Sequence, residues 1–277
     1  MRNQAAWLAI AAVLLSAAPR AQDSAAIDAR RKALDDILDM DVRDGYVYYR
    51  ALKTDRGKLD RYVAQIATAD VNALDREEQI AFWLNAYNAL VLKTVIDHYP
   101  IMGHAAGYPS KSIRQVPGAF ERTAHMIAGR MVTLDDIEKQ TLAGYHDPRL
   151  FFAIGRGAVG GGRLRSEAFT GAMLEQQLAQ VAAECASRTQ CVEVNRAAGT
   201  VSASPVFSWE EQEFVAGYAG KAPPVFASRS PIERAILGFV EPKLLTTERD
   251  FLDMNTFRVA FHTFDWTLND LTGRGGR

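Results

Sequence analysis

The chain has 277 residues, of which 48% are hydrophobic, and its 32 basic side chains nearly balance 33 acidic ones. A formal net charge of −1 gives no broad positive field, which argues against nucleic acids and anionic membrane surfaces as partners. No internal repeat or low-complexity linker is present, so we expect one domain over residues 27–272.

The N-terminus has the order of a secretory signal peptide. Arg2 precedes an apolar run from Ala5 to Ala18. A transmembrane helix needs about 20 apolar residues and a signal h-region roughly 7–15, so the length favours a signal peptide. Cleavage after Ala21 predicts a signal peptide over residues 1–21, no membrane span afterwards, and a periplasmic or secreted protein. The alternative is an N-terminal helix of a cytoplasmic protein.

Helical spacing dominates the next part of the chain. Apolar residues predict an amphipathic helix from Ile27 to Met40, and a short β-rich stretch, Tyr46 to Tyr49, precedes a second helix with Ile66 in its apolar stripe. Asp75 is a good N-cap for a long helix running to about Tyr99.

The centre of that long helix is apolar on every side, which indicates a helix surrounded by protein. Asn85 and Asn88 are therefore expected inside, where a carboxamide without partners costs about 1–3 kcal/mol. Either they bond to neighbouring loops as structural clamps, or they face a polar cavity and contact a ligand.

After a glycine- and proline-rich loop, a hairpin is predicted around the turn Gly129-Arg130, followed by a helix that Thr133 caps. The apolar run from Leu150 to Ile154 predicts a buried strand. Ser208 is expected to cap a later helix. Further helices and short strands follow without regular interleaving, so the predicted fold is α+β: a helix-dominated single domain with a small sheet of short strands.

Cys185 and Cys191 lie where a helical pattern gives way to a strand-like one. In an oxidising compartment a disulfide between them is expected, and a pair of free thiols is the alternative. No metal site is predicted, because two thiols without a nearby histidine are an incomplete zinc site.

Residues 155–160 read Gly-Arg-Gly-Ala-Val-Gly, a literal G-x-G-x-x-G after an apparent strand. A dinucleotide site needs a helix to start at once, whereas helical spacing here begins only near Thr170, so no cofactor is expected. The loop does bring Arg156, Arg163 and Arg165 together. They either face solvent or hold a small anionic ligand through charge-assisted bonds.

Candidate catalytic groups are few. No G-x-S-x-G or H-E-x-x-H motif occurs. His262 and Asp265 are three residues apart near the C-terminus, where they can pair, although a histidine at a strand end is more often a structural hydrogen-bonding group.

Several stretches together resemble the family catalogued as domain of unknown function 547. They are residues 82–90 (FWLNAYNAL), 129–138 (GRMVTLDDIE), 147–149 (DPR), 164–165 (LR), 167–169 (EAF) and 264–270 (FDWTLND). The resemblance covers most of the chain after the signal peptide and implies no settled activity.

One departure from the family pattern bears on function. Similar sequences carry a histidine and a cysteine pair in H-F-A-L-N-C-G-A-x-S-C-P-P-L-R, and here those positions are Phe151, Arg156 and Gly161, with Gly162 and Arg163 replacing the prolines. The resemblance implies that any chemistry of those thiols and that imidazole is lost.

Three hypotheses about function follow. The first is a non-catalytic exported protein that binds a small anionic ligand or a partner protein at the altered loop. The second is an envelope hydrolase of peptide or cell-wall material that uses His262, Asp265 and Asn85. The third is a structural role in an envelope assembly.

Overall fold

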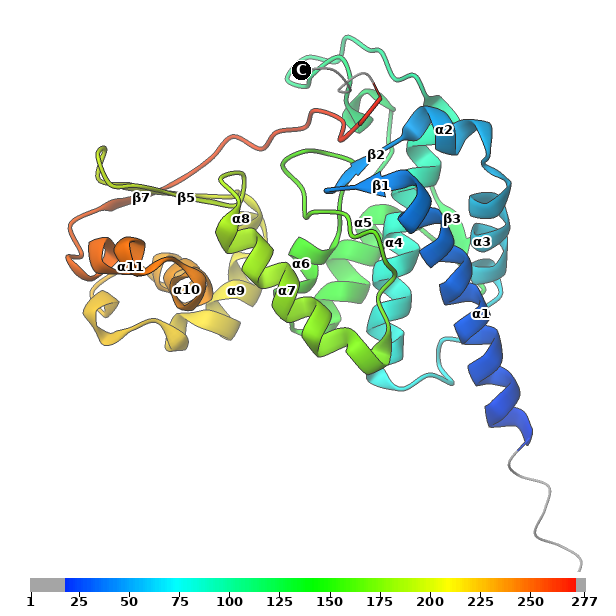
Figure 1. Ribbon diagram of the computed structural model, residues 1–277, viewed down its shortest axis with the longest axis horizontal. Helices are drawn as coiled ribbons and strands as arrows, with labels where there is room; N and C mark the ends of the chain where they lie inside the picture. The colour runs from blue at the N-terminus through cyan, green and yellow to red at the C-terminus, as the bar shows by residue number, and fades with distance from the viewer. Residues whose placement is uncertain (1–17, 273–277) are drawn as a thin grey trace, which may run out of the picture.

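The computed structural model describes residues 18–272 (Figure 1). The fold is a helix-dominated α+β single domain, 53% helical, as the sequence predicts. In the described part of the chain the strands form two two-stranded sheets and one three-stranded sheet. Most of the predicted signal peptide lies outside the described residues; α1 begins at Ala18 and ends at Asp41.

The remaining helices are α2 (Tyr49–Thr54), α3 (Gly57–Ala67), α4 (Arg76–His98), α5 (Leu134–Asp136), α6 (Leu150–Ala153), α7 (Leu174–Ser187), α8 (Val206–Trp209), α9 (Glu211–Tyr218), α10 (Pro231–Val240) and α11 (Thr246–Asp253). The strands are β1 (Val42–Arg43), β2 (Tyr46–Val47), β3 (His125–Ile127), β4 (Arg130–Val132), β5 (Val192–Asn195), β6 (Thr200–Ala203) and β7 (Arg258–Phe261). Strand β6 pairs antiparallel with β5 and parallel with β7.

In Figure 1, α1 to α4 lie on one side of the molecule, and α9 to α11 with the three-stranded sheet lie on the other. Helices α6 and α7 lie between these groups. The buried apolar side chains form one core cluster that runs from Leu34 to Leu268.

Helix α4 is the central element of the core. Its N-terminus is fixed by the predicted cap, because the Asp75 carboxylate accepts a hydrogen bond from the Glu78 N–H at 2.9 Å. From Ile80 to Ile96 nearly every side chain of α4 is buried. The all-round apolar pattern therefore correctly predicted a helix surrounded by protein.

The predicted strand from Leu150 to Ile154 is wrong, because Leu150–Ala153 form the helix α6. The Asp147 carboxylate accepts the Arg149 N–H at 3.1 Å, and the Asp147 carbonyl accepts the Leu150 N–H at 3.1 Å. These bonds start a helical turn at Asp147-Pro148. A short apolar run fits a buried helix as well as a buried strand, and here the turn at Asp147 leads into a helix.

Three boundaries also differ from the prediction. The hairpin turn is Ala128-Gly129, because Ile127 pairs with Arg130, and both turn residues have positive φ, as a two-residue turn requires. Ser208 lies inside α8 and caps nothing. The second predicted helix is divided into α2 and α3.

The C-terminal segment links the two sides of the molecule. After β7 it runs back across the structure to the β1–β2 hairpin (Figure 1). It bonds to residues 155–162, called the glycine-rich loop below, with Val159 N–H donating to the Thr267 carbonyl at 2.9 Å. It also bonds to β2, with Val47 N–H donating to the Asn269 carbonyl at 2.9 Å. The C-terminal segment thus connects the glycine-rich loop to strand β2.

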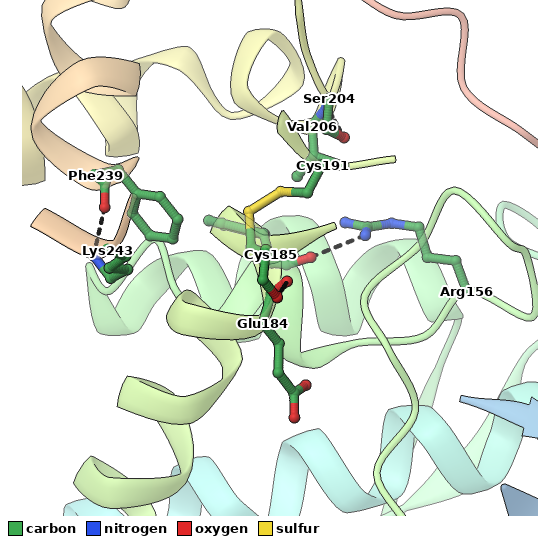
Figure 2. Close-up of a disulfide and its surroundings, with 10 residues drawn as sticks. Arg156, Glu184, Cys185, Cys191, Ser204, Val206, Phe239 and Lys243 are labelled. Atoms are coloured by element: carbon green, nitrogen blue, oxygen red, sulfur yellow. Dashed lines mark hydrogen bonds between the residues drawn. A yellow bond between two sulfur atoms is a disulfide. The ribbon is translucent and has the colours of Figure 1, made fainter. Parts of the chain in front are cut away.

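The predicted disulfide is present and joins the end of α7 to the residue before β5 (Figure 2). Cys185 and Cys191 are both buried, and the Cys191 carbonyl accepts the Ser204 N–H at 2.7 Å. The bond therefore ties α7 to the start of the three-stranded sheet.

Reducing this disulfide should lower the free energy of unfolding by about 2 kcal/mol, because the closed loop from Cys185 to Cys191 is short. Urea unfolding with and without a phosphine reductant measures the change. The double variant Cys185→Ala/Cys191→Ala serves as the control, and an equal effect of the reductant on that variant would contradict the assignment.

Candidate functional site

A buried ion pair lies at the centre of the glycine-rich loop. Arg156 is 2% exposed and Glu138, in the π-helix Ile137–Leu142, is 5% exposed. The Arg156 guanidinium donates from Nε to Glu138 Oε1 at 3.1 Å, with a second bond to the same oxygen from Nη2. Its Nη1 donates to the Phe151 carbonyl at 2.9 Å, and the Tyr87 hydroxyl donates to Glu138 Oε2 at 3.0 Å. Each charge is therefore compensated and hydrogen-bonded.

The same contacts set the protonation states. Burial acts to lower the pKa of Arg156, but the charge and hydrogen bond of Glu138, together with Tyr87 and Glu210, raise that pKa overall. Burial and then the Glu138 charge raise the pKa of Tyr87 well above its usual range. Arg156 is thus a fixed cation and Tyr87 a fixed hydrogen-bond donor.

Backbone conformation turns Arg156 inward. Its φ is +48° and that of Gly157 is +63°, both in the left-handed region. The next helical turn begins only at Gly171, so the loop lacks the immediate helix of a dinucleotide-binding fingerprint. The two alternatives for Arg156, a solvent-facing side chain or an anion contact, are both wrong because its guanidinium is enclosed.

The loop after Arg156 packs against backbone. A Cβ on Gly162 would meet the Phe152 carbonyl oxygen at 2.0 Å, and one on Gly161 would meet the Gly155 carbonyl oxygen at 2.4 Å. Such contacts leave space only for glycine. The glycine-rich loop is therefore closely packed.

Arg163 and Arg165 also pair with carboxylates. Arg163 contacts Asp44 at 2.5 Å and Glu184 at 3.5 Å. Arg165 pairs with Glu167 and donates to the Gln180 side-chain oxygen at 2.8 Å. The three loop arginines therefore do not converge on a common anion position.

Both core asparagines are clamps for backbone. Asn85 donates to the Phe169 carbonyl and accepts the Phe169 N–H, each at 2.8 Å. Asn88 accepts the Gly155 N–H at 2.9 Å and donates to the Ala153 carbonyl at 3.2 Å. Of the two alternatives from the sequence, these contacts fit structural clamping, and Asn88 fixes the start of the glycine-rich loop on α4.

His262 and Asp265 come together in an open groove of about 250 Å³. The groove, called the His262 groove below, is lined by Gly160, Thr189, Gln190, Glu193, Pro205, His262, Thr263, Phe264 and Asp265. Asn85 lies elsewhere, in a small hollow beside α1 and α3. The residues of the predicted hydrolase site are thus only partly brought together.

His262 and Asp265 differ in their hydrogen bonding. His262 Nε2 is buried without a hydrogen-bond partner. The Asp265 carboxylate accepts the Thr267 N–H at 2.9 Å, and the Asp265 carbonyl accepts the Gly160 N–H at 2.9 Å. Asp265 is therefore fixed against the glycine-rich loop, while the unpartnered Nε2 of His262 is buried away from solvent.

Aromatic rings support one wall of the groove. The Phe264 ring lies 4.9 Å from that of Trp209 and 4.5 Å from that of Trp266. Trp209 is 46% exposed, and the Arg156 guanidinium lies 5.9 Å from its ring centre. Tryptophan fluorescence is therefore a natural reporter of events in the groove.

Glu210, which follows Trp209, is a group that the sequence did not single out. Burial, then the charge of Glu138, raises its pKa to about 7. A carboxyl with a raised folded-state pKa binds more protons when folded. Its contribution to stability is present below its unfolded pKa, near 4.3, and is lost as pH rises through 7.

We therefore expect the Glu210→Gln variant to remove a fall in unfolding free energy that wild type shows between about pH 4.5 and pH 7. Urea unfolding at half-unit pH steps measures the free energy of unfolding of both proteins. The contributions of the other carboxylates cancel in the difference between the two. Parallel pH profiles for both proteins would show that Glu210 does not titrate in this range.

Residues 18–272 contain neither a helix suited to span a membrane nor a cluster suited to bind a metal ion. No helix in this range has the length and apolar character needed to cross a bilayer. No set of three or more His, Cys, Asp or Glu side chains in this range is placed to hold a metal ion.

One comparison with known proteins finds a match. A family model described as "Protein of unknown function, DUF547" matches residues 71–184, which run from before α4 to near the end of α7. No curated protein and no solved structure matches the chain significantly. The matched segment contains the ion pair, both asparagines and the glycine-rich loop, whereas most of the His262 groove follows it. This match supports the resemblance to the DUF547 family of proteins of unknown function over residues 71–184.

Proposed function

We propose that this chain is an exported, non-catalytic binding protein and that its ligand occupies the His262 groove. The observation that carries the proposal is the buried pair of Arg156 and Glu138. It commits the loop position where similar sequences have a cysteine to a structural contact, while an open polar groove lies on the same loop at Gly160.

The sequence of the loop supports the absence of catalysis there. Residues 150–165 contain no histidine, cysteine or serine, and Phe151, at the position of the usual histidine, is 1% exposed. Nucleophilic catalysis needs a nucleophile beside a base. This loop has neither.

The groove itself has the properties of a binding site. Its volume of about 250 Å³ is slightly below the range of about 300–1,000 Å³ usual for small-ligand pockets. Its walls are fixed by the disulfide beside Gln190 and by the bond between Gly160 and Asp265. A preformed wall reduces the ordering cost of binding.

A thermal-shift screen with small polar compounds tests the proposal. We expect at least one compound to raise the melting temperature of wild type, and the Glu193→Gln variant to respond less, because Glu193 lines the groove. Glu211→Gln, an exposed glutamate of α9 outside the groove, is the matched control. Equal responses from all three proteins to every compound would place the ligand elsewhere.

Export is tested separately. The full chain, expressed in a Gram-negative host, should be recovered from the periplasm or medium with its N-terminus near Gln22, because cleavage after Ala21 is expected. An intact N-terminus on protein in the cytosol would contradict export.

The alternative is an envelope hydrolase acting on peptide or cell-wall material, and one observation favours it: His262 and Asp265 line the same groove. It requires turnover that His262→Ala abolishes. Turnover in wild type with that dependence would replace the binding proposal.

A further inference from the structure

A second hollow adjoins the His262 groove and shares two of its lining residues, Gly160 and Gln190. Its other lining residues include Gly161, Gly162, Arg163, Glu184 and Arg188, and the two disulfide cysteines. The volume of about 10 Å³ admits a group no larger than about one water molecule or carboxylate oxygen. This hollow therefore extends one end of the groove.

Arg188 brings a positive charge to this end, near the carboxylates of Glu184 and Asp44. It follows the last residue of α7 and is half-buried. Within residues 18–272 its guanidinium has no carboxylate within 4 Å and no hydrogen bond, whereas neighbouring Arg163 has two carboxylate partners. Burial, and then the Arg163 charge, lower the pKa of Arg188, but an arginine stays protonated at any physiological pH.

The backbone holds Arg188 in place. Its carbonyl accepts the N–H groups of Cys191 and Val192, each at 2.9 Å, inside the loop that the disulfide closes. These bonds fix the backbone from which the side chain extends. A half-buried guanidinium without a hydrogen-bond partner favours an anionic group of a ligand, because charge-assisted hydrogen bonds are stronger than neutral ones.

The lining of the groove also carries negative charge. Glu193 and Asp265 both line it and are exposed, and neither has a basic partner within 4 Å in the described part of the chain. The groove and the hollow that extends it thus carry charges of both signs.

From this polarity we propose that the groove binds a short peptide with free termini, its carboxylate at Arg188 and its ammonium at Glu193 and Asp265. The inference rests on the proposed function and names the ligand class of the same site. A purely anionic ligand would meet two carboxylates, and a purely cationic one would leave Arg188 without a partner.

Titration calorimetry at pH 6.5 with dialanine and trialanine tests this inference, since both peptides are zwitterions at that pH. We expect one of them to bind, and its N-acetylated and C-amidated forms to bind about tenfold to a hundredfold more weakly, because each lacks one charge-assisted contact. The capped peptides test both charges without altering the protein.

Two variants assign the contacts. Arg188→Met should remove the preference for the free carboxylate over the amide, and Glu193→Gln should reduce the preference for the free amine over the acetylated form. Arg196→Met, an exposed arginine outside the groove, should behave as wild type. Equal binding of free and capped peptides, or a carboxylate preference that survives Arg188→Met, would overturn the inference.

The peptide inference and the proposed binding groove can fail separately. If neither peptide binds but another compound shifts the melting temperature through Glu193, the peptide inference is wrong and the groove remains the site. If peptides bind and neither Glu193→Gln nor Arg188→Met alters binding, both the inference and the proposed groove are wrong.

Discussion

Glu138→Gln should lower the free energy of unfolding by about 3–5 kcal/mol, because the change leaves the buried Arg156 guanidinium without its counter-charge. The substitution keeps the size of the side chain, so the loss reports mainly charge. Urea unfolding followed by circular dichroism measures the effect.

Two controls make this result specific. Lys139→Gln removes an exposed ion pair with Asp135 next to the same position, and we expect a cost of at most about 1 kcal/mol. Replacing both buried partners, as in Glu138→Leu/Arg156→Met, should recover most of the stability, since two apolar groups leave no buried charge unpaired. A double variant less stable than Glu138→Gln would contradict this account of the pair.

Gly162→Ala should be the second severe change, lowering the free energy of unfolding by about 3 kcal/mol or more. The new methyl group would lie 2.0 Å from the Phe152 carbonyl oxygen and 2.9 Å from that of Ile154. Both atoms are backbone at the end of α6, so no side chain can move aside. Thermal and urea unfolding measure the loss.

Gly144→Ala is the matched control, because a methyl group there meets nothing within 4 Å. We expect it to change stability by at most about 0.5 kcal/mol. If Gly162→Ala unfolded with the same midpoint as Gly144→Ala, the close packing of the loop would be refuted.

Much of the fold follows from local patterns in the sequence. The apolar surface all round α4, the Asp75 cap and the spacing of the two cysteines each depend on nearby residues, and the structure confirms them. The run from Leu150 to Ile154 was misassigned because periodicity cannot separate a short buried helix from a short buried strand.

The candidate site was harder to predict because its contacts join distant residues. Glu138 precedes Arg156 by 18 residues, and nothing in the pattern indicates that a positive φ turns the arginine toward it. The burial of Asn85 and Asn88 was predictable from the helix, but their backbone partners near Phe169 and Gly155 were not. Arg188 carried no local signal, because its lack of a partner is a property of the packed chain.

The most direct test of the central claim is ligand binding by the Glu138→Leu/Arg156→Met double variant, measured by tryptophan fluorescence titration with the compound that stabilises wild type. If the loop pair is structural and the groove binds, the double variant should show the affinity of wild type while Glu193→Gln shows less. A folded double variant that no longer binds, beside a Glu193→Gln variant that binds normally, would contradict the claim.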